Sequence, residues 1–120
     1  MTQDRPDIQE ILTTVAEFAR GVAARSEGGE RYDALCAAFL VEVAKRELNA
    51  GDNPERRQRA QLNALTGTPP GTDLYAAFCA RVRTGGLDAD WERAFAFALM
   101  QVIDKVAVTN PDYLEPSHRR

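Results

Sequence analysis

The sequence predicts an all-α protein, a single compact bundle of about five helices in which the first, second and fifth are long and the third and fourth are short. Apolar residues recur every three to four positions through most of the chain. Glycine and proline clusters separate these segments, and no segment alternates with the two-residue period of a strand. The 120 residues fit one domain, which we place at residues 1–114, with a disordered tail over 115–120.

The first helix is expected from about Pro6 to Arg25. Asp4 can cap it, with Pro6 in the first turn, and Gly28-Gly29 follow as a stop signal. One side of this helix carries an apolar stripe that should pack on another element. Its members are Ile8, Ile11, Leu12, Val15, Phe18, Ala19 and Val22.

The second helix is expected from about Glu30 to Asn49, ending before Gly51. Its apolar residues fall on two opposite sides, which is typical of a helix in the middle of a bundle. The main face holds Tyr32, Leu35, Cys36, Phe39, Leu40 and Val43, and the second face holds Ala37, Val41, Ala44 and Leu48.

The third and fourth helices are predicted to be short. Asn53 caps the third, which ends near Gly67 and points Leu62 and Leu65 inward. The run 55–59 reads as its solvated surface, and residues 67–72 form a loop. The fourth starts at Thr72 or Asp73 and ends at Gly85-Gly86. Its inward residues are expected to be Leu74, Tyr75, Phe78 and Val82.

The fifth helix, from about Asp90 to Thr109, is apolar on nearly every side and is therefore predicted to be the most buried element. One face holds Trp91, Phe95, Ala98, Leu99, Val102 and Val106, and the other holds Phe97, Met100 and Val108.

Charged residues within these apolar helices are the candidate site. Asp104 and Lys105 diverge by about 100° and cannot pair with each other. We predict that Glu42, Arg46 and Lys105 meet where the second and fifth helices cross, and that Asp104 finds another partner, because unpaired buried charge is costly. Such a cluster suits an internal ion-pair network that fixes helix register, or a pocket for a small ligand or a partner.

The motif that closes the fifth helix combines Asn110, Pro111 and Tyr113. Pro111 disfavours helical geometry at Asn110, so the helix should stop there. Tyr113 and Leu114 are expected to fold back over the apolar end of the bundle. The motif is thus interpreted as a helix stop and a lid.

Composition narrows the possible functions. The net charge of −3 disfavours nucleic acid and anionic membrane surfaces as partners. The start of the chain has no signal-peptide pattern and no apolar run approaches a bilayer span, so we expect a soluble cytoplasmic protein. Cys36 and Cys79 are interpreted as small, reduced hydrophobic residues.

Catalytic chemistry finds little support in the sequence. The one histidine, His118, lies in the tail, which disfavours histidine-activated nucleophiles and histidine metal sites. No phosphate-binding glycine loop is present, and we expect neither a metal nor a cofactor. Glu42 and Asp104 could do acid–base chemistry if they were buried. The sequence thus leans toward a non-catalytic protein.

Three stretches carry a family resemblance: RPDIQEILTTVAEF near the start, EVAKREL in the middle and VIDKVAVTNPDYL near the end. Together they resemble a bacterial helical family of unknown function. Members of that family are typically encoded beside, or fused to, acyl-CoA dehydrogenases and aminoglycoside-phosphotransferase-like kinases. The resemblance implies an accessory or protein-interaction module whose partner is one of these proteins or a second copy of itself. The alternative is a binder of an acyl or acyl-CoA-like ligand, or an enzyme, that uses the Glu42, Arg46, Asp104 and Lys105 cluster.

Overall fold

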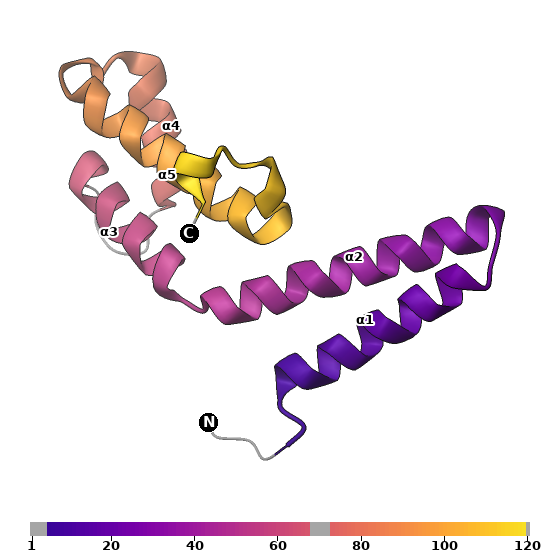
Figure 1. Cartoon of the computed structure of the whole chain (residues 1–120). Helices are drawn as coiled ribbons and strands as arrows, with labels where there is room; N and C mark the ends of the chain where they lie inside the picture. Colours follow the sequence, from indigo (N-terminus) through magenta and orange to yellow (C-terminus); the bar gives the residue numbers. More distant parts are fainter. Residues whose placement is uncertain (1–4, 68–72, 120) are drawn as a thin grey trace. The chain divides into compact units, whose positions relative to one another are not determined.

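The computed structural model of the protein describes residues 5–67 and 73–119 (Figure 1). Its five α-helices are α1 (Ile8–Ala24), α2 (Gly28–Ala50), α3 (Asn53–Thr66), α4 (Leu74–Thr84) and α5 (Trp91–Thr109). Three short 3-10 turns accompany them: η1 (Asp88–Asp90), η2 (Pro111–Tyr113) and η3 (Pro116–His118). No strand occurs among the described residues. The all-α prediction, with three long and two shorter helices, is confirmed.

The described chain divides into two compact units. The hairpin unit comprises the residues up to Asn49 together with Val108–Asn110, and the C-terminal unit comprises Ala50–Ala107 and the residues from Pro111 onward. A single domain over residues 1–114 therefore stays a prediction, as does disorder over 115–120. Within the second range, Pro116–His118 form the η3 turn.

In the hairpin unit, α1 and α2 run antiparallel beside each other (Figure 1). Asp7 caps α1 by accepting a 2.8 Å hydrogen bond from the Glu10 backbone nitrogen. Asp4, the cap that the sequence suggested, lies outside the described residues. Gly28, which the sequence assigned to the end of the first segment, instead begins α2 with a φ of +60°. A left-handed φ at this position suits glycine because it has no Cβ.

Small side chains form the contact between α1 and α2. Ala16 is 0% exposed, Ala23 is 2% exposed and Ala38 is 4% exposed. The larger apolar residues of both helices stay in contact with solvent, so the prediction of α2 as a helix buried on both faces is wrong. The exposed members are Ile8, Ile11, Val15 and Phe18 on α1 and Tyr32, Leu35, Phe39, Leu40 and Leu48 on α2.

The C-terminal unit has its own apolar core. Phe97 of α5 is 1% exposed, and its ring lies edge-on to Phe78 of α4, with 5.1 Å between centroids. Leu62 and Leu65 point inward from α3, as predicted. The cluster is completed by Leu87 and Ala94, with Leu74, Phe78 and Met100 packed against it.

Local signals define the start of α4 and the C-terminal ends of α3 and α4. Asn53, predicted to cap α3, is instead its first helical residue, and Asp52 before it makes no side-chain cap bond. Asp73 caps α4 by accepting a 3.1 Å bond from the Ala76 nitrogen. Gly67 and Gly85 end the two helices in the left-handed conformation, with φ of +61° and +82°. The predicted loop that joins them lies largely in residues 68–72, outside the described part. Tyr75 and Val82, expected to point inward, are 41% and 38% exposed.

Helix α5 is buried on one side only. Phe97 and Ala94 lie in the core, whereas Trp91, Phe95 and Val102 are each 56% exposed. The prediction that α5 is covered all round is therefore wrong for the Trp91 face. Among the described residues, no helix combines the length and apolar character required to cross a bilayer.

We expect Leu62→Ala to destabilise the protein by about 2–5 kcal/mol, because it leaves a cavity in the closely packed core of the C-terminal unit. Leu40→Ala is the matched control: Leu40 is 64% exposed, and its truncation should cost less than about 1 kcal/mol. Urea unfolding followed by circular dichroism measures both values. Equal losses of unfolding free energy for the two variants would contradict the burial of Leu62 in this core.

Candidate functional site

Glu42, the first residue of the predicted cluster, forms its ion pairs inside the hairpin unit. Its Oε1 accepts a 2.9 Å hydrogen bond from Nη2 of Arg20 on α1, and Lys45 Nζ lies 3.6 Å from Oε2. The bond from Arg20 holds the pKa of the Glu42 carboxyl below its usual value, with Lys45 adding to the effect. Glu42 thus links α1 to α2, and the Glu42 carboxylate pairs with Arg20 and Lys45 rather than with Arg46.

Arg46 is half-buried and donates from Nε to the backbone carbonyl of Val108, at 2.7 Å. Val108 belongs to the last turn of α5, where carbonyl groups lack partners within the helix. A cation at this end also complements the helix dipole. Arg46 thus supplies a hydrogen-bond donor to a backbone carbonyl in the last turn of α5.

Asp104 is the buried carboxylate of the C-terminal unit, with its side chain 4% exposed. Its Oδ2 accepts from Gln58 Nε2 at 3.2 Å, and its Oδ1 lies 3.4 Å from Nη2 of Arg57. The Gln58 oxygen accepts a 2.7 Å bond from the Tyr75 hydroxyl. Desolvation, followed by the charge of Glu55, raises the pKa of that hydroxyl. We call Arg57, Gln58, Tyr75 and Asp104 the Asp104 network; it joins α3, α4 and α5.

The partners of Asp104 were not identified from the sequence. Arg57 and Gln58 sit in the run 55–59, which was interpreted as solvated surface. That reading holds for Arg59 and Glu55, which form an exposed ion pair at 3.0 Å. Gln58 is half-buried. The sequence did contain a signal for the position of Gln58. Gln58 lies four residues, about one helical turn, before Leu62 and therefore faces the same inward side of the helix.

Lys105, the fourth cluster residue, is exposed on α5. Glu42 and Arg46 belong to the hairpin unit, and Asp104 and Lys105 belong to the C-terminal unit. The meeting of Glu42, Arg46 and Lys105 therefore stays a prediction. Within each unit, Glu42 and Asp104 have polar partners of their own.

The closing motif follows α5 directly. The helix ends at Thr109, and Asn110 stands exposed before the η2 turn that Pro111 begins. Leu114 is 9% exposed, as a lid would require, whereas Tyr113 is 83% exposed and covers no apolar surface. Arg119 donates to the carbonyls of Leu114 and Asp112 at 2.9 and 3.0 Å, which ties the last described turn to the motif.

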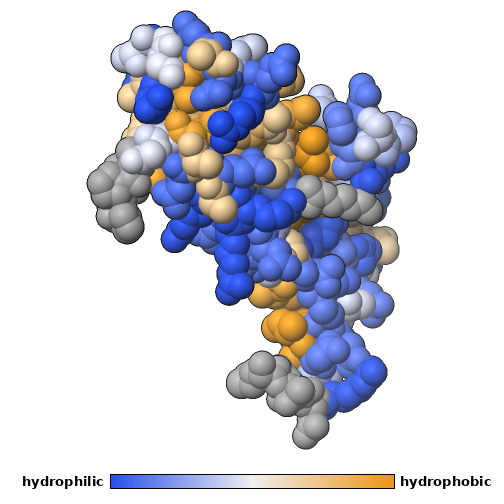
Figure 2. Space-filling model, turned by 90° about the vertical axis from the view of Figure 1, so that its left-hand side faces the viewer, coloured by the Kyte–Doolittle hydropathy of each residue, from blue (hydrophilic) through white to orange (hydrophobic). Residues whose placement is uncertain are grey.

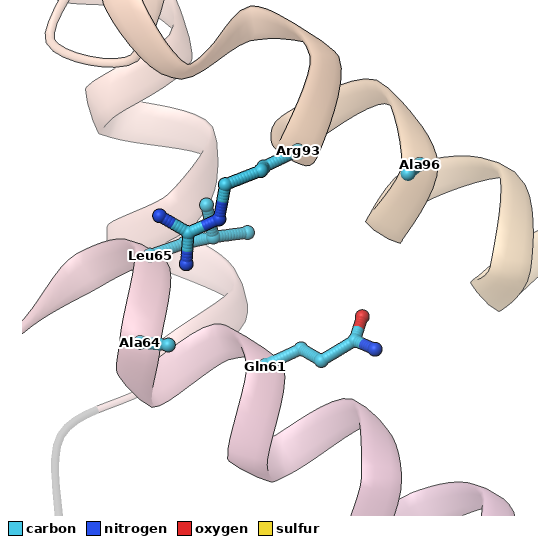
Figure 3. A pocket seen from close by; sticks show the side chains of 5 residues that line it. All are labelled: Gln61, Ala64, Leu65, Arg93 and Ala96. Atoms are coloured by element: carbon cyan, nitrogen blue, oxygen red, sulfur yellow. The ribbon is translucent and has the colours of Figure 1, made fainter.

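An open groove of about 320 Å³ lies between α3 and α5 (Figure 3). Arg93 reaches from α5 toward α3, and Gln61 reaches from α3 toward α5. Leu65 and two alanines, Ala64 and Ala96, give the groove an apolar lining. Arg93 Nη1 lies 3.9 Å from Asp90, an exposed and loose ion pair that leaves guanidinium donors available. The groove suits a small anion with an apolar portion.

These features define a class of protein: an all-α protein with an N-terminal helical hairpin and a three-helix C-terminal unit stabilised by an internal carboxylate network. The described residues contain no group of His, Cys, Asp and Glu that could hold a metal ion. Residues 24–113 match the family described as "Domain of unknown function (DUF6285)", and since the match covers most of the chain, the protein belongs to this family. No curated protein and no solved structure is significantly similar to the chain.

We expect Asp104→Ala to cost about 1–3 kcal/mol of unfolding free energy, because the Gln58 amide loses a buried acceptor. Tyr75→Phe keeps the ring 6.5 Å from Phe97 and removes only the hydroxyl, so it should cost about 1 kcal/mol. Chemical denaturation of both variants measures these losses. If the Asp104 variant unfolded at the wild-type midpoint, the Asp104 network would not stabilise the unit.

Proposed function

We propose that the protein is a non-catalytic accessory module that binds a partner protein through the exposed apolar face of α5. We call Trp91, Phe95, Leu99 and Val102 the α5 stripe. Residues three and four apart lie on one side of a helix, so these four side chains form a continuous row. Leu99 is 39% exposed and the other three are each 56% exposed. This exposed row is the observation that carries the proposal.

The α5 stripe has the chemistry of a binding surface. Tryptophan and other large aromatic side chains dominate the energetics of protein interfaces. Trp91 and Phe95 already lie beside each other, with 6.5 Å between ring centroids and planes tilted by 40°. Because this contact already restricts the two side chains, ordering them on binding should cost less conformational entropy. Along the helix axis the row spans roughly 17 Å, which suits the apolar side of one partner helix.

The partners we propose are those that the family resemblance implies: an acyl-CoA dehydrogenase or an aminoglycoside-phosphotransferase-like kinase. Two features of the chain agree with an accessory role. Its single histidine is His118, and its carboxylates Glu42 and Asp104 already form bonds with Arg20 and Gln58. The module would add a docking surface to such an enzyme and leave the chemistry to it.

Co-expression with each candidate enzyme tests the proposal. The wild-type chain should co-purify with one of them, and Trp91→Glu should abolish co-purification because it places a charge in the apolar contact. Val82→Glu is the control, since Val82 is an exposed apolar residue of α4 outside the α5 stripe. Failure of the wild-type chain to bind either enzyme would overturn the proposal, as would equal losses for the two variants.

A second candidate function is the binding of a small acyl carboxylate in the groove between α3 and α5. The observation that favours it is the guanidinium of Arg93 beside the apolar side chain of Leu65 (Figure 3). Arginine binds carboxylates with paired donors, and about 300 Å³ is the lower limit for a ligand pocket.

Titration with hexanoate, followed by NMR chemical shifts, tests this candidate. We expect millimolar binding, with hexanol much weaker because it lacks the charge. Arg93→Met should reduce hexanoate binding at least about tenfold, since one charge-assisted bond contributes about 1.5–3 kcal/mol. Arg59→Met, which removes an exposed arginine outside the groove, should leave binding unchanged. Equal shifts with hexanol and hexanoate would exclude carboxylate recognition.

A further inference from the structure

The groove between α3 and α5 receives a polar side chain from each of these helices. Arg93 of α5 and Gln61 of α3 both line it, and each reaches toward the opposite helix (Figure 3). The guanidinium of Arg93 offers only hydrogen-bond donors, whereas the amide of Gln61 offers donors and an acceptor. A carboxylate with a plain alkyl chain satisfies the guanidinium and gives the amide no partner. The two side chains together fit a ligand with a second polar group.

The two polar groups stand at successive levels along the groove. Helices α3 and α5 run antiparallel: the first half of α3 bonds to the second half of α5 through the Asp104 network, and the other two halves line the groove. Leu65 therefore lies near the level of Arg93, and Gln61 lies near the level of Ala96. These levels are three to four residues apart on each helix, which corresponds to about 5 Å along the helix axis.

The Gln61 amide is accessible to a ligand. Gln61 is exposed, and no hydrogen bond joins its amide to another residue within the described part of the chain. By contrast, the amide of Gln58, on the same helix, is already bonded within the Asp104 network. Arg93 is also exposed and keeps donors available beside its 3.9 Å pair with Asp90. Both groups can therefore exchange bound water for a ligand.

The rest of the groove is apolar. Leu65 is 6% exposed and belongs to the core of the C-terminal unit, so it forms a fixed floor. The side chains of Ala64 and Ala96 are single methyl groups and leave the space above this floor open. Figure 2 shows hydrophobic areas, in orange, that reach the surface beside hydrophilic ones, in blue. A ligand with an aliphatic part beside its polar groups suits such a mixed lining.

An N-acylated amino acid combines the three features that this lining matches. Its carboxylate accepts paired bonds from a guanidinium, and its amide presents a carbonyl and an N–H to the amide of a glutamine. Its side chain, where aliphatic, can cover the apolar floor. The acyl group and the carboxylate are about one residue length apart, roughly 3.8 Å. This separation is close to the spacing of about 5 Å between the two levels of the groove.

We propose that the groove between α3 and α5 binds N-acylated amino acids with an aliphatic side chain, and that Gln61 provides this specificity. Arg93 holds the carboxylate, Gln61 exchanges hydrogen bonds with the ligand amide, and the aliphatic side chain lies on Leu65. A ligand without the amide displaces water from Gln61 and returns no hydrogen bond. The inference rests on the second candidate function, because it assigns the ligand class of the same groove.

Two ligands that differ by one group test the role of the amide. N-acetyl-L-leucine and 4-methylpentanoate share the carboxylate and the branched carbon skeleton, and the acetamido group occurs only in the first. Titration of the full chain with each ligand, followed by NMR chemical shifts, measures both dissociation constants. The constant for N-acetyl-L-leucine should be at least about fivefold lower, the factor that one net hydrogen bond contributes.

The variant Gln61→Met keeps the length of the side chain and removes its amide. It should raise the dissociation constant of N-acetyl-L-leucine at least about fivefold and leave that of 4-methylpentanoate unchanged, which also shows that the groove is intact. Asn63→Ala is the matched control. Asn63 is an exposed amide of the same helix, about 200° around the axis from Gln61, so this variant should bind both ligands like the wild type.

The outcomes separate this inference from the second candidate function. Equal affinities of the wild-type chain for the two ligands would overturn the assignment of N-acylated amino acids and leave carboxylate binding in place. Equal weakening of both ligands by Gln61→Met would also overturn it, because Gln61 would then act on the groove without contacting the amide. If neither ligand moved any signal, this inference and the second candidate function would fail together.

Discussion

The burial of Asp104 on the same side of α5 as Phe97 constrains the whole C-terminal unit. The two residues are seven apart, about two turns of helix, so any element that covers Phe97 must also accommodate a carboxylate. Helix α3 meets both demands: Leu62 and Leu65 join the apolar core, while Gln58 and Arg57 supply donors. Tyr75 extends the network to α4. The polar contact adds directional hydrogen bonds between α3 and α5 to the apolar packing of the same two helices.

The sequence predicted the helices well because their signals are local. Asp73 and Pro54 mark helix starts, Gly67 and Gly85 mark helix ends, and Leu62 and Leu65 were placed in the core by spacing alone. Capping and left-handed glycine geometry depend on a few neighbouring residues. The expected all-α class with three long and two short helices follows from these signals.

Tertiary burial was predicted less well, since an apolar side chain does not specify which surface covers it. Spacing identified the stripes of α1, α2 and α5 but not their exposure, and α5 was expected to be buried on both sides. The partners of Glu42 and Asp104 were also missed, because Arg20, Arg57 and Gln58 lie 22, 47 and 46 residues away in sequence. Single-sequence reasoning has no information on contacts at such separations.

Trp91 has a further consequence. It is the single tryptophan of the chain, it lies on the α5 stripe, and it is 56% exposed. Fluorescence excited at wavelengths that tryptophan absorbs and the three tyrosines do not thus originates at one solvated indole and reports on the surroundings of this one helix. Loss of water from the indole would move its emission to shorter wavelength and shield it from aqueous quenchers. The molecule therefore carries a built-in optical probe of α5.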